Sequence, residues 1–160
     1  MTESLQAREG RSVLRMERWL KHPPDKVWKA VTEPERLADW FPGRIAPELR
    51  EGGAVTFEFG DDGAVTDLDP PRLIAYTWGD DHLRWELHPD GDGTRLVLLH
   101  TFDDHYGAAS FGAGWHTCIV ALELALDGSP GADPEVDDVA LHERLVAQFG
   151  LDTGTVEADG

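Results

Sequence analysis

The chain has 160 residues, 41% of them hydrophobic and 9% aromatic, which suffices for one domain with a substantial core and argues against a disordered protein. Its formal charge of −17 at pH 7 repels nucleic-acid phosphates and anionic lipid headgroups, so we expect no nucleic-acid partner. No apolar run reaches the roughly 18 residues that cross a bilayer, so we expect no membrane span.

The N-terminal segment and the cysteine count both favour a cytoplasmic protein. Residues 1–18 lack the basic region followed by an apolar region that marks an exported chain. Cys118 is the only cysteine, which excludes an internal disulfide and fits a reducing compartment. The acidity is interpreted as a solvated surface, and an acidic patch that docks a basic partner is the alternative.

The first forty residues predict a strand followed by two short helices. Apolar residues alternate with polar ones over 12–20, which is typical of a strand. Pro23 and Pro24 end this strand, and a short amphipathic helix is expected after them. Thr32 is placed to cap a second short helix that ends near Phe41.

Residues 43–102 predict a series of strands joined by tight turns. The turn signals are the Asp-Asp-Gly at 61–63, the two prolines at 70–71 and the glycine-rich segment at 89–93. Strands spaced by about ten residues are typical of an antiparallel sheet.

A long helix is expected over 112–126, because its apolar residues recur at steps of three and four. Neither this helix nor a one-sided sheet can bury its apolar face alone. The simplest solution wraps a curved sheet around the helix, which makes the chain an α+β protein.

The remaining residues predict a linker and a short helix. We expect the main domain over 10–127, and over 128–160 a linker, a docking helix at 134–149 and a frayed tail of ten residues. The helix is expected to dock on the domain or on a second copy of the chain, which leaves a homodimer open. Its docking face is expected to consist of Val139, Leu145, Val146 and Phe149.

Five segments resemble, in the same order, the START-like (SRPBCC) superfamily. They read "HPPDKVWKAVTEPERLADWF", "GG.V.F.F", "DPPRLIAYTW", "PDGDGTRLVLLHTFDD" and "GWHTCIVALELAL", and they cover roughly residues 10–127. The branch they resemble is the one named for the activator of the 90-kDa heat-shock chaperone's ATPase. The resemblance implies a helix-grip fold, in which six to seven antiparallel strands curve around the long C-terminal helix and two short helices follow strand 1.

The resemblance also implies an apolar cavity and no shared catalytic signature. Members bind lipids, polyketides, hormones or other hydrophobic molecules, and a minority catalyse cyclisation or hydrolysis. We expect the helices at 24–40 and the segment 103–111 to cover the open end of a cavity of a few hundred cubic ångströms. The residues expected to line it are Trp40, Phe57, Tyr76, Trp78, Trp85, Leu98, His100, Phe111 and Trp115. The aromatic ones are equally typical of an ordinary core.

His100 is the candidate for chemistry, as a polar anchor or acid–base group, and the alternative is a hydrogen-bonded core histidine. His100, Asp103, Asp104 and His105 lie within six residues, but they alternate between strand faces, so we expect no metal site and no cofactor. Asp103 or Asp104 is expected to cap the following turn instead.

At the start of the long helix, packing is favoured over a reactive site. Trp115 lies on the apolar stripe and is expected to form a cavity wall. His116 is expected at the surface, and Cys118 is expected to be an unreactive core thiol.

Three functions remain open. The favoured one is a non-enzymatic carrier or sensor of a small hydrophobic molecule. The second is an enzyme that uses His100 with a cavity carboxylate on a polyketide-like substrate, and the third is a chaperone-linked interaction module. Several ionisable groups in the cavity would favour the enzyme. A closed apolar cavity would favour the carrier, and an exposed apolar patch would favour the interaction module.

Overall fold

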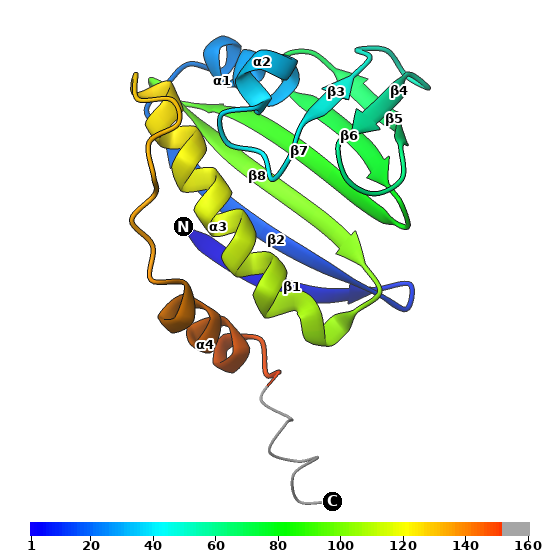
Figure 1. Cartoon of the computed structure of the whole chain (residues 1–160), viewed down its shortest axis with the longest axis vertical. Coiled ribbons are helices and arrows are strands. Elements are labelled where there is room, and N and C mark those ends of the chain that lie inside the picture. The colour runs from blue at the N-terminus through cyan, green and yellow to red at the C-terminus, as the bar shows by residue number, and fades with distance from the viewer. Residues whose placement is uncertain (152–160) are drawn as a thin grey trace, which may run out of the picture.

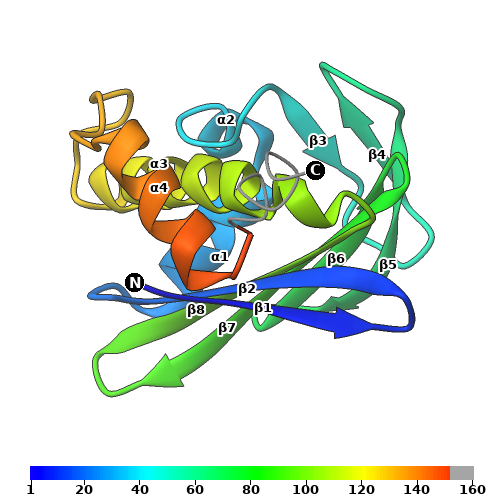
Figure 2. The ribbon, with the colours of Figure 1, turned by 90° about the horizontal axis from the view of Figure 1, so that it is seen from below.

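The computed structural model describes residues 1–151 and contains one antiparallel sheet in the strand order β1-β2-β8-β7-β6-β5-β4-β3. The sheet is curved, and the helices lie on its concave side (Figures 1 and 2). The strands are β1 (Thr2–Arg8), β2 (Arg11–Leu20), β3 (Ile45–Pro47), β4 (Ala54–Phe57), β5 (Gly63–Asp69), β6 (Leu73–Trp78), β7 (Asp81–Asp90) and β8 (Gly93–Phe102).

One long helix crosses the concave face of the sheet (Figure 1). The helices are α1 (Pro24–Thr32), α2 (Pro34–Leu37), the 3₁₀ turn η1 (His105–Gly107), α3 (Ala108–Leu126) and α4 (Asp138–Gln148). Helix α3 buries its apolar side, including Ile119 and Leu122, against the sheet. The predicted α+β helix-grip fold is therefore confirmed, with α3 beginning at Ala108 rather than at residue 112.

The sheet has eight strands, more than the six to seven predicted, because β1 and β3 add to it. Strand β1 pairs with β2 through a tight turn whose two central residues, Glu9 and Gly10, have φ values of 54° and 81°. A turn with positive φ at both central positions has a backbone twist that matches the twist of the two strands that the turn joins. β1 is an edge strand with a mostly exposed, polar sequence, so it lacks the alternation that identifies a half-buried strand.

The prediction that Thr32 caps the second helix is wrong. Thr32 is the last residue of α1, and its hydroxyl donates to the carbonyl oxygen of Trp28 at 2.7 Å. The N-cap of α2 is Glu33, without a side-chain cap bond. Pro34 at the first helical position has no N–H to cap, which reduces the need for such a bond.

Helix α4 docks on α3 of the same chain through the predicted face, except that Val139 is not part of it. The helix begins at Asp138 rather than at residue 134, and the Asp137 carboxylate accepts a cap bond from the Ala140 N–H. Leu141 and Leu145 are buried, whereas Val139 is 69% exposed. Val139 lies two positions, or about 200°, from Leu141, so it points away from α3.

Phe149 and Val146 pack against the core from the end of α4, as predicted. Leu151, the first of the ten residues expected to fray, is also buried. The rest of that expected segment, 152–160, lies outside the described residues.

The polar end of α4 is joined to the first strand. The Glu3 carboxylate of β1 is 2% exposed and lies 3.2 Å and 3.4 Å from two guanidinium nitrogens of Arg144. The side-chain amide of Gln148 donates to the Glu3 carbonyl oxygen at 2.7 Å. These bonds hold the two ends of the described chain together on one side of α3 (Figure 2).

The stretch 105–126 is long and apolar enough to cross a membrane by length and composition alone. Here it packs on the concave face of the sheet, and this packing explains its apolar character.

Candidate functional site

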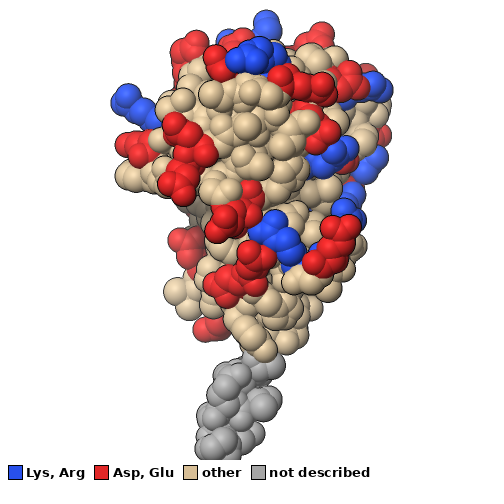
Figure 3. All heavy atoms as spheres, turned by 90° about the vertical axis from the view of Figure 1, so that its right-hand side faces the viewer, with Lys and Arg blue, Asp and Glu red and all other residues tan. Residues whose placement is uncertain are grey.

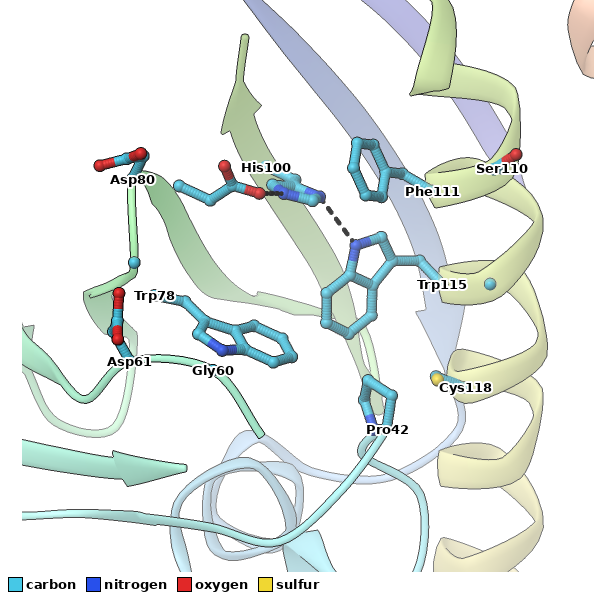
Figure 4. A pocket seen from close by; sticks show the side chains of 13 residues that line it. Pro42, Gly60, Asp61, Trp78, Asp80, His100, Ser110, Phe111, Trp115 and Cys118 are labelled. Atoms are coloured by element: carbon cyan, nitrogen blue, oxygen red, sulfur yellow. Dashed lines mark hydrogen bonds and ion pairs between the residues drawn. The ribbon is translucent and has the colours of Figure 1, made fainter. Parts of the chain in front are cut away.

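A cavity of about 570 Å³ opens to solvent between the first half of α3 and the sheet end where β6 turns into β7 (Figure 4). The α3 side contributes Ser110, Phe111, Gly114, Trp115 and Cys118. The sheet side contributes His100 from β8 and the segment Trp78–Asp81, and Pro42, Gly60 and Asp61 complete the rim from two loops.

The cavity exists because small residues leave its walls uncovered. A Cβ atom added to Gly114 would meet no atom within 4 Å, although this glycine lies in the middle of a packed helix. The walls themselves are large and apolar, since Trp78 faces Phe111 and Trp115 across the opening (Figure 4). Trp78 is held flat against Phe57, with ring centroids 4.6 Å apart and an interplanar angle of 3°.

Four of the nine residues expected to line the cavity do so: Trp78, His100, Phe111 and Trp115. Five others lie in the closed core behind it and do not line it: Trp40, Phe57, Tyr76, Trp85 and Leu98. The alternation along the strands places Phe57, Tyr76, Trp85 and Leu98 on the concave face correctly. That part of the face is filled, however, because the segment after α2 inserts its aromatic rings there.

The filled part is an aromatic cluster. Trp40 meets Trp85 edge to face at 5.3 Å between ring centroids. The Trp85 indole N–H donates to the Tyr76 hydroxyl at 3.0 Å. Burial raises the pKa of Tyr76, so this hydroxyl stays protonated. Its satisfied polar groups and edge-to-face rings make the cluster part of the closed core behind the cavity.

His100 forms hydrogen bonds through both ring nitrogens. The Trp115 indole N–H donates to Nδ1 of His100 at 3.0 Å, and Nε2 lies 2.8 Å from Oδ2 of Asp81 (Figure 4). An indole N–H can only donate, so Nδ1 must accept and carries no proton. The ring proton is therefore on Nε2, where it donates to the Asp81 carboxylate. His100 is 4% exposed and combines both expectations: a satisfied core histidine that also forms part of a cavity wall.

Asp81 is a cavity residue that the sequence analysis missed, although a signal for it exists. The tight turn between β7 and β8 pairs Asp90 with Gly93 and Leu83 with His100. In that register, alternate residues of β7 counted back from Leu83 share the face of His100. Asp81 is the next such residue, so the turn at 91–92 predicts its proximity to His100.

The other side-chain donors of the cavity are also engaged. The Trp78 indole N–H donates to the Phe59 carbonyl oxygen at 3.1 Å. The Ser110 hydroxyl pairs with Nε2 of His142 at 3.3 Å. Burial raises the pKa of the Cys118 thiol to about 11, so the thiol is protonated and unreactive at neutral pH, as expected.

Three carboxylates, those of Asp61, Asp80 and Asp81, line the side of the cavity opposite α3. Within residues 1–151, no Lys or Arg lines it. The neighbouring cation is Arg11, which pairs with Asp103 at 2.7 Å and donates to the Asp80 carbonyl oxygen at 2.6 Å. The hydrogen bond to Asp103, and then the charges of Asp103, Asp81 and Asp80, raise the pKa of Arg11.

This ion pair corrects the prediction that Asp103 or Asp104 caps the next turn. Asp103 pairs with Arg11, and Asp104 precedes η1 without a side-chain cap bond. Among residues 1–151, no three His, Cys, Asp or Glu side chains are grouped so that they could hold a metal ion. The chain has 31 acidic and 14 basic residues, and acidic side chains are spread over the face shown in Figure 3.

His116, expected at the surface, is partly buried between α3 and β1. Its Nδ1 atom is buried without a hydrogen-bond partner among the described residues, 3.7 Å from a Glu3 carboxylate oxygen. Burial lowers the pKa of His116, and the nearby charge of Glu3 opposes this effect.

The family model described as activator of Hsp90 ATPase homolog 1-like protein matches residues 21–127. No curated protein matches the chain in sequence.

Solved structures share the fold over nearly the whole chain. CalU16 from Micromonospora echinospora superposes with a TM-score of 0.75 and 22% identity, over 93% of this chain and 94% of that one. EF2215 from Enterococcus faecalis, a conserved protein of unknown function, has a TM-score of 0.76 and 19% identity, and the match covers 91% of this chain and 89% of EF2215. DynU16, a protein in the dynemicin biosynthetic locus, has a TM-score of 0.67 and 25% identity, and the match covers 76% of this chain and 49% of DynU16.

Proposed function

This chain belongs to the family of activator of Hsp90 ATPase homolog 1-like proteins, and on that premise we propose that it binds a small, flat, largely apolar molecule as a carrier or sensor. The observation that carries the proposal is the open cavity of about 570 Å³ between Trp78, Phe111 and Trp115. Its volume lies in the range of small-molecule sites, roughly 300–1,000 Å³. Burial of a flat ring between these walls stabilises a complex by about 25 cal/mol per Å² of apolar surface.

The enzyme alternative is supported by the ionisable groups in the cavity, yet the geometry of His100 disfavours it. To act as a base, Nδ1 would first have to lose its bond to Trp115, and to act as an acid, Nε2 would have to leave Asp81. General acid–base catalysis requires a nitrogen within reach of the substrate proton. We therefore propose binding without assigning a reaction.

The chaperone-linked alternative follows from the family description alone. The large apolar side chains most exposed in the described part of the chain come from separate segments: Trp19, Leu49, Phe59, Tyr106 and Val139. Single exposed apolar side chains are ordinary on protein surfaces, so these five do not by themselves support this function. We propose a cytoplasmic location because the only cysteine is a partly buried, protonated thiol that needs no oxidising compartment.

The test fills the cavity without disturbing the fold. Gly114→Leu inserts a large side chain at a helical position whose Cβ direction is open, so we expect a melting temperature equal to or above that of the wild type. The probe is N-phenyl-1-naphthylamine, an uncharged fluorophore that brightens in apolar surroundings. We expect its affinity to fall at least about 10-fold in Gly114→Leu, which corresponds to the loss of about 1.4 kcal/mol of binding free energy.

Ala147→Leu is the matched control, because Ala147 is exposed on α4 and outside the cavity. This variant adds the same kind of apolar surface without filling the cavity, and it should bind the probe as the wild type does. Equal affinity in wild type and Gly114→Leu, or no binding by the wild type, would overturn the proposed function.

A further inference from the structure

The side-chain polar atoms of the cavity divide into donors that are already used and acceptors that are still available. The donors are used within the protein. The Trp78 indole N–H donates to the Phe59 carbonyl oxygen, and the Trp115 indole N–H donates to His100. The Nε2–H of His100 donates to Asp81. A carboxylate accepts at about four lone-pair positions. Oδ1 of Asp81 has no hydrogen-bond partner within residues 1–151, so it remains free to accept from a molecule in the cavity.

The other two carboxylates add charge to the same side of the cavity. Figure 4 shows Asp61 and Asp80 across the opening from Phe111, Trp115 and Cys118. Neither carboxylate forms a hydrogen bond or ion pair with a side chain of the described residues, and both residues are exposed. An anion that enters the cavity therefore meets three negative charges and, among the described residues, no free cationic side chain, because Arg11 lies outside the lining and is bound to Asp103.

The aromatic walls favour the same class of molecule. The face of a tryptophan ring attracts a cation, and Trp78, which stacks one face of its ring on Phe57, lies on the same side of the cavity as the carboxylates (Figure 4). The whole chain is also strongly acidic, at −17, which raises the local concentration of cations at its surface.

The geometry points to a flat aromatic amine, positively charged at neutral pH, as the ligand class of this cavity. Its ring lies between Trp78 and the Phe111–Trp115 wall, and its N–H group donates to Oδ1 of Asp81. This inference rests on the proposed function and names the chemistry of its ligand. Asp81 is then the residue that selects the ligand, and His100, held by Trp115, fixes the orientation of the Asp81 carboxylate.

Three acridines of nearly equal size and different charge test the inference by fluorescence titration. These are 9-aminoacridine, a cation at neutral pH, uncharged acridine, and the anion acridine-9-carboxylate. We expect the cation to bind at least about 10-fold more tightly than acridine, as a charge-assisted bond to a carboxylate would produce, and acridine more tightly than the anion. Equal affinity for the three would overturn the inference.

Asp81→Asn separates the role of Asp81 from the general charge of the chain. The amide oxygen of Asn can still accept from His100 Nε2–H, while the negative charge and the free acceptor are lost. We expect the affinity of 9-aminoacridine to fall about 10-fold and that of acridine to change by less than about 2-fold. Asp92→Asn, in the exposed turn between β7 and β8, makes the same change in net charge and should leave both affinities unaltered.

Asp80→Asn provides a second variant, because within residues 1–151 its carboxylate has no side-chain partner whose loss could unfold the chain. It should weaken 9-aminoacridine binding less than Asp81→Asn does. An unchanged preference for the cation in both variants would overturn the inference. Binding of N-phenyl-1-naphthylamine without any preference for the cation would overturn this inference alone, whereas failure of every probe to bind would also overturn the proposed function.

Discussion

Two glycines of α3 lie two residues apart and have opposite surroundings. A Cβ atom at Gly112 would lie 2.9 Å from Cδ1 of Leu145 in α4, whereas a Cβ atom at Gly114 would meet nothing within 4 Å. One side of the helix is therefore covered by the tail of the chain, and the other side faces the cavity. The same helix thus serves as a packing surface and as the wall of a site.

The cavity therefore does not result from a shortage of apolar residues. Trp115 is 5% exposed and packs against Phe41, but Phe111 and Trp78 are only partly buried at the opening. No segment of the described chain fills the space of about 570 Å³ beside them, so this space is available for a ligand.

The largest expected effect is on the covered side. Leu145→Ala removes a fully buried side chain at the contact between α4 and α3, and we expect the free energy of unfolding to fall by about 2–5 kcal/mol. Val139→Ala, on the exposed side of α4, should change it by less than about 0.5 kcal/mol. Urea denaturation of both variants measures the difference. Equal effects would mean that α4 does not dock as described.

The two glycines themselves predict a smaller effect with opposite signs. Gly114→Ala should stabilise the protein by about 0.5–1 kcal/mol, because alanine is the better helix former and the space is open. Gly112→Ala gains the same propensity but forces Leu145 to move, and overpacking of this kind costs about 1–3 kcal/mol. Thermal melts of the two variants should therefore shift in opposite directions, and a shared stabilisation would show that the contact with α4 is loose.

The smallest expected effect is a pH dependence on the covered side. Burial lowers the pKa of His116 in the folded protein below its value of 6.5 in the unfolded chain, so the unfolded chain binds more protons between these two values. Stability contributed by neutral His116 is therefore present above pH 6.5 and is lost as the pH falls below it. His116→Leu should flatten the decline between pH 6.5 and pH 5, measured by urea denaturation at each pH.

His82 provides the comparison for this pH experiment. Burial also lowers its pKa, but it lies on the sheet beside Thr66, away from α4. His82→Gln should remove a separate part of the decline, additive with that of His116→Leu because the two residues share no partner. A decline that neither variant alters would exclude both histidines as its cause.

Elements with strong periodicity could be predicted from the sequence. The strands between residues 54 and 102 and the helix α3 alternate or repeat apolar residues clearly, and their turns carry glycine or proline. Strand β1 could not be recognised, because its stability comes from pairing with β2 and from the burial of Glu3 against Arg144. Neither contact leaves a pattern within the seven residues of the strand itself.

The candidate site could be predicted only in part, because alternation shows which face a residue occupies but not what covers it. Trp78 and Trp85 are both concave-face residues in the sequence, yet Trp40 covers Trp85 and leaves Trp78 at the opening. The Asp61 and Asp80 carboxylates come from turns, where a sequence shows only a solvated charge. Their convergence on one cavity depends on the twist of the sheet and on the length of each hairpin.

The ion pair between Glu3 and Arg144 has a consequence for the order in which the chain acquires its structure during synthesis. The two residues are 141 positions apart, so helix α4 can reach strand β1 only after Arg144 has left the ribosome. Until then the Glu3 carboxylate, which is buried in the folded protein, remains exposed to water on the β1–β2 hairpin. Closing so long a loop is entropically costly, which makes this contact a late event on the folding pathway.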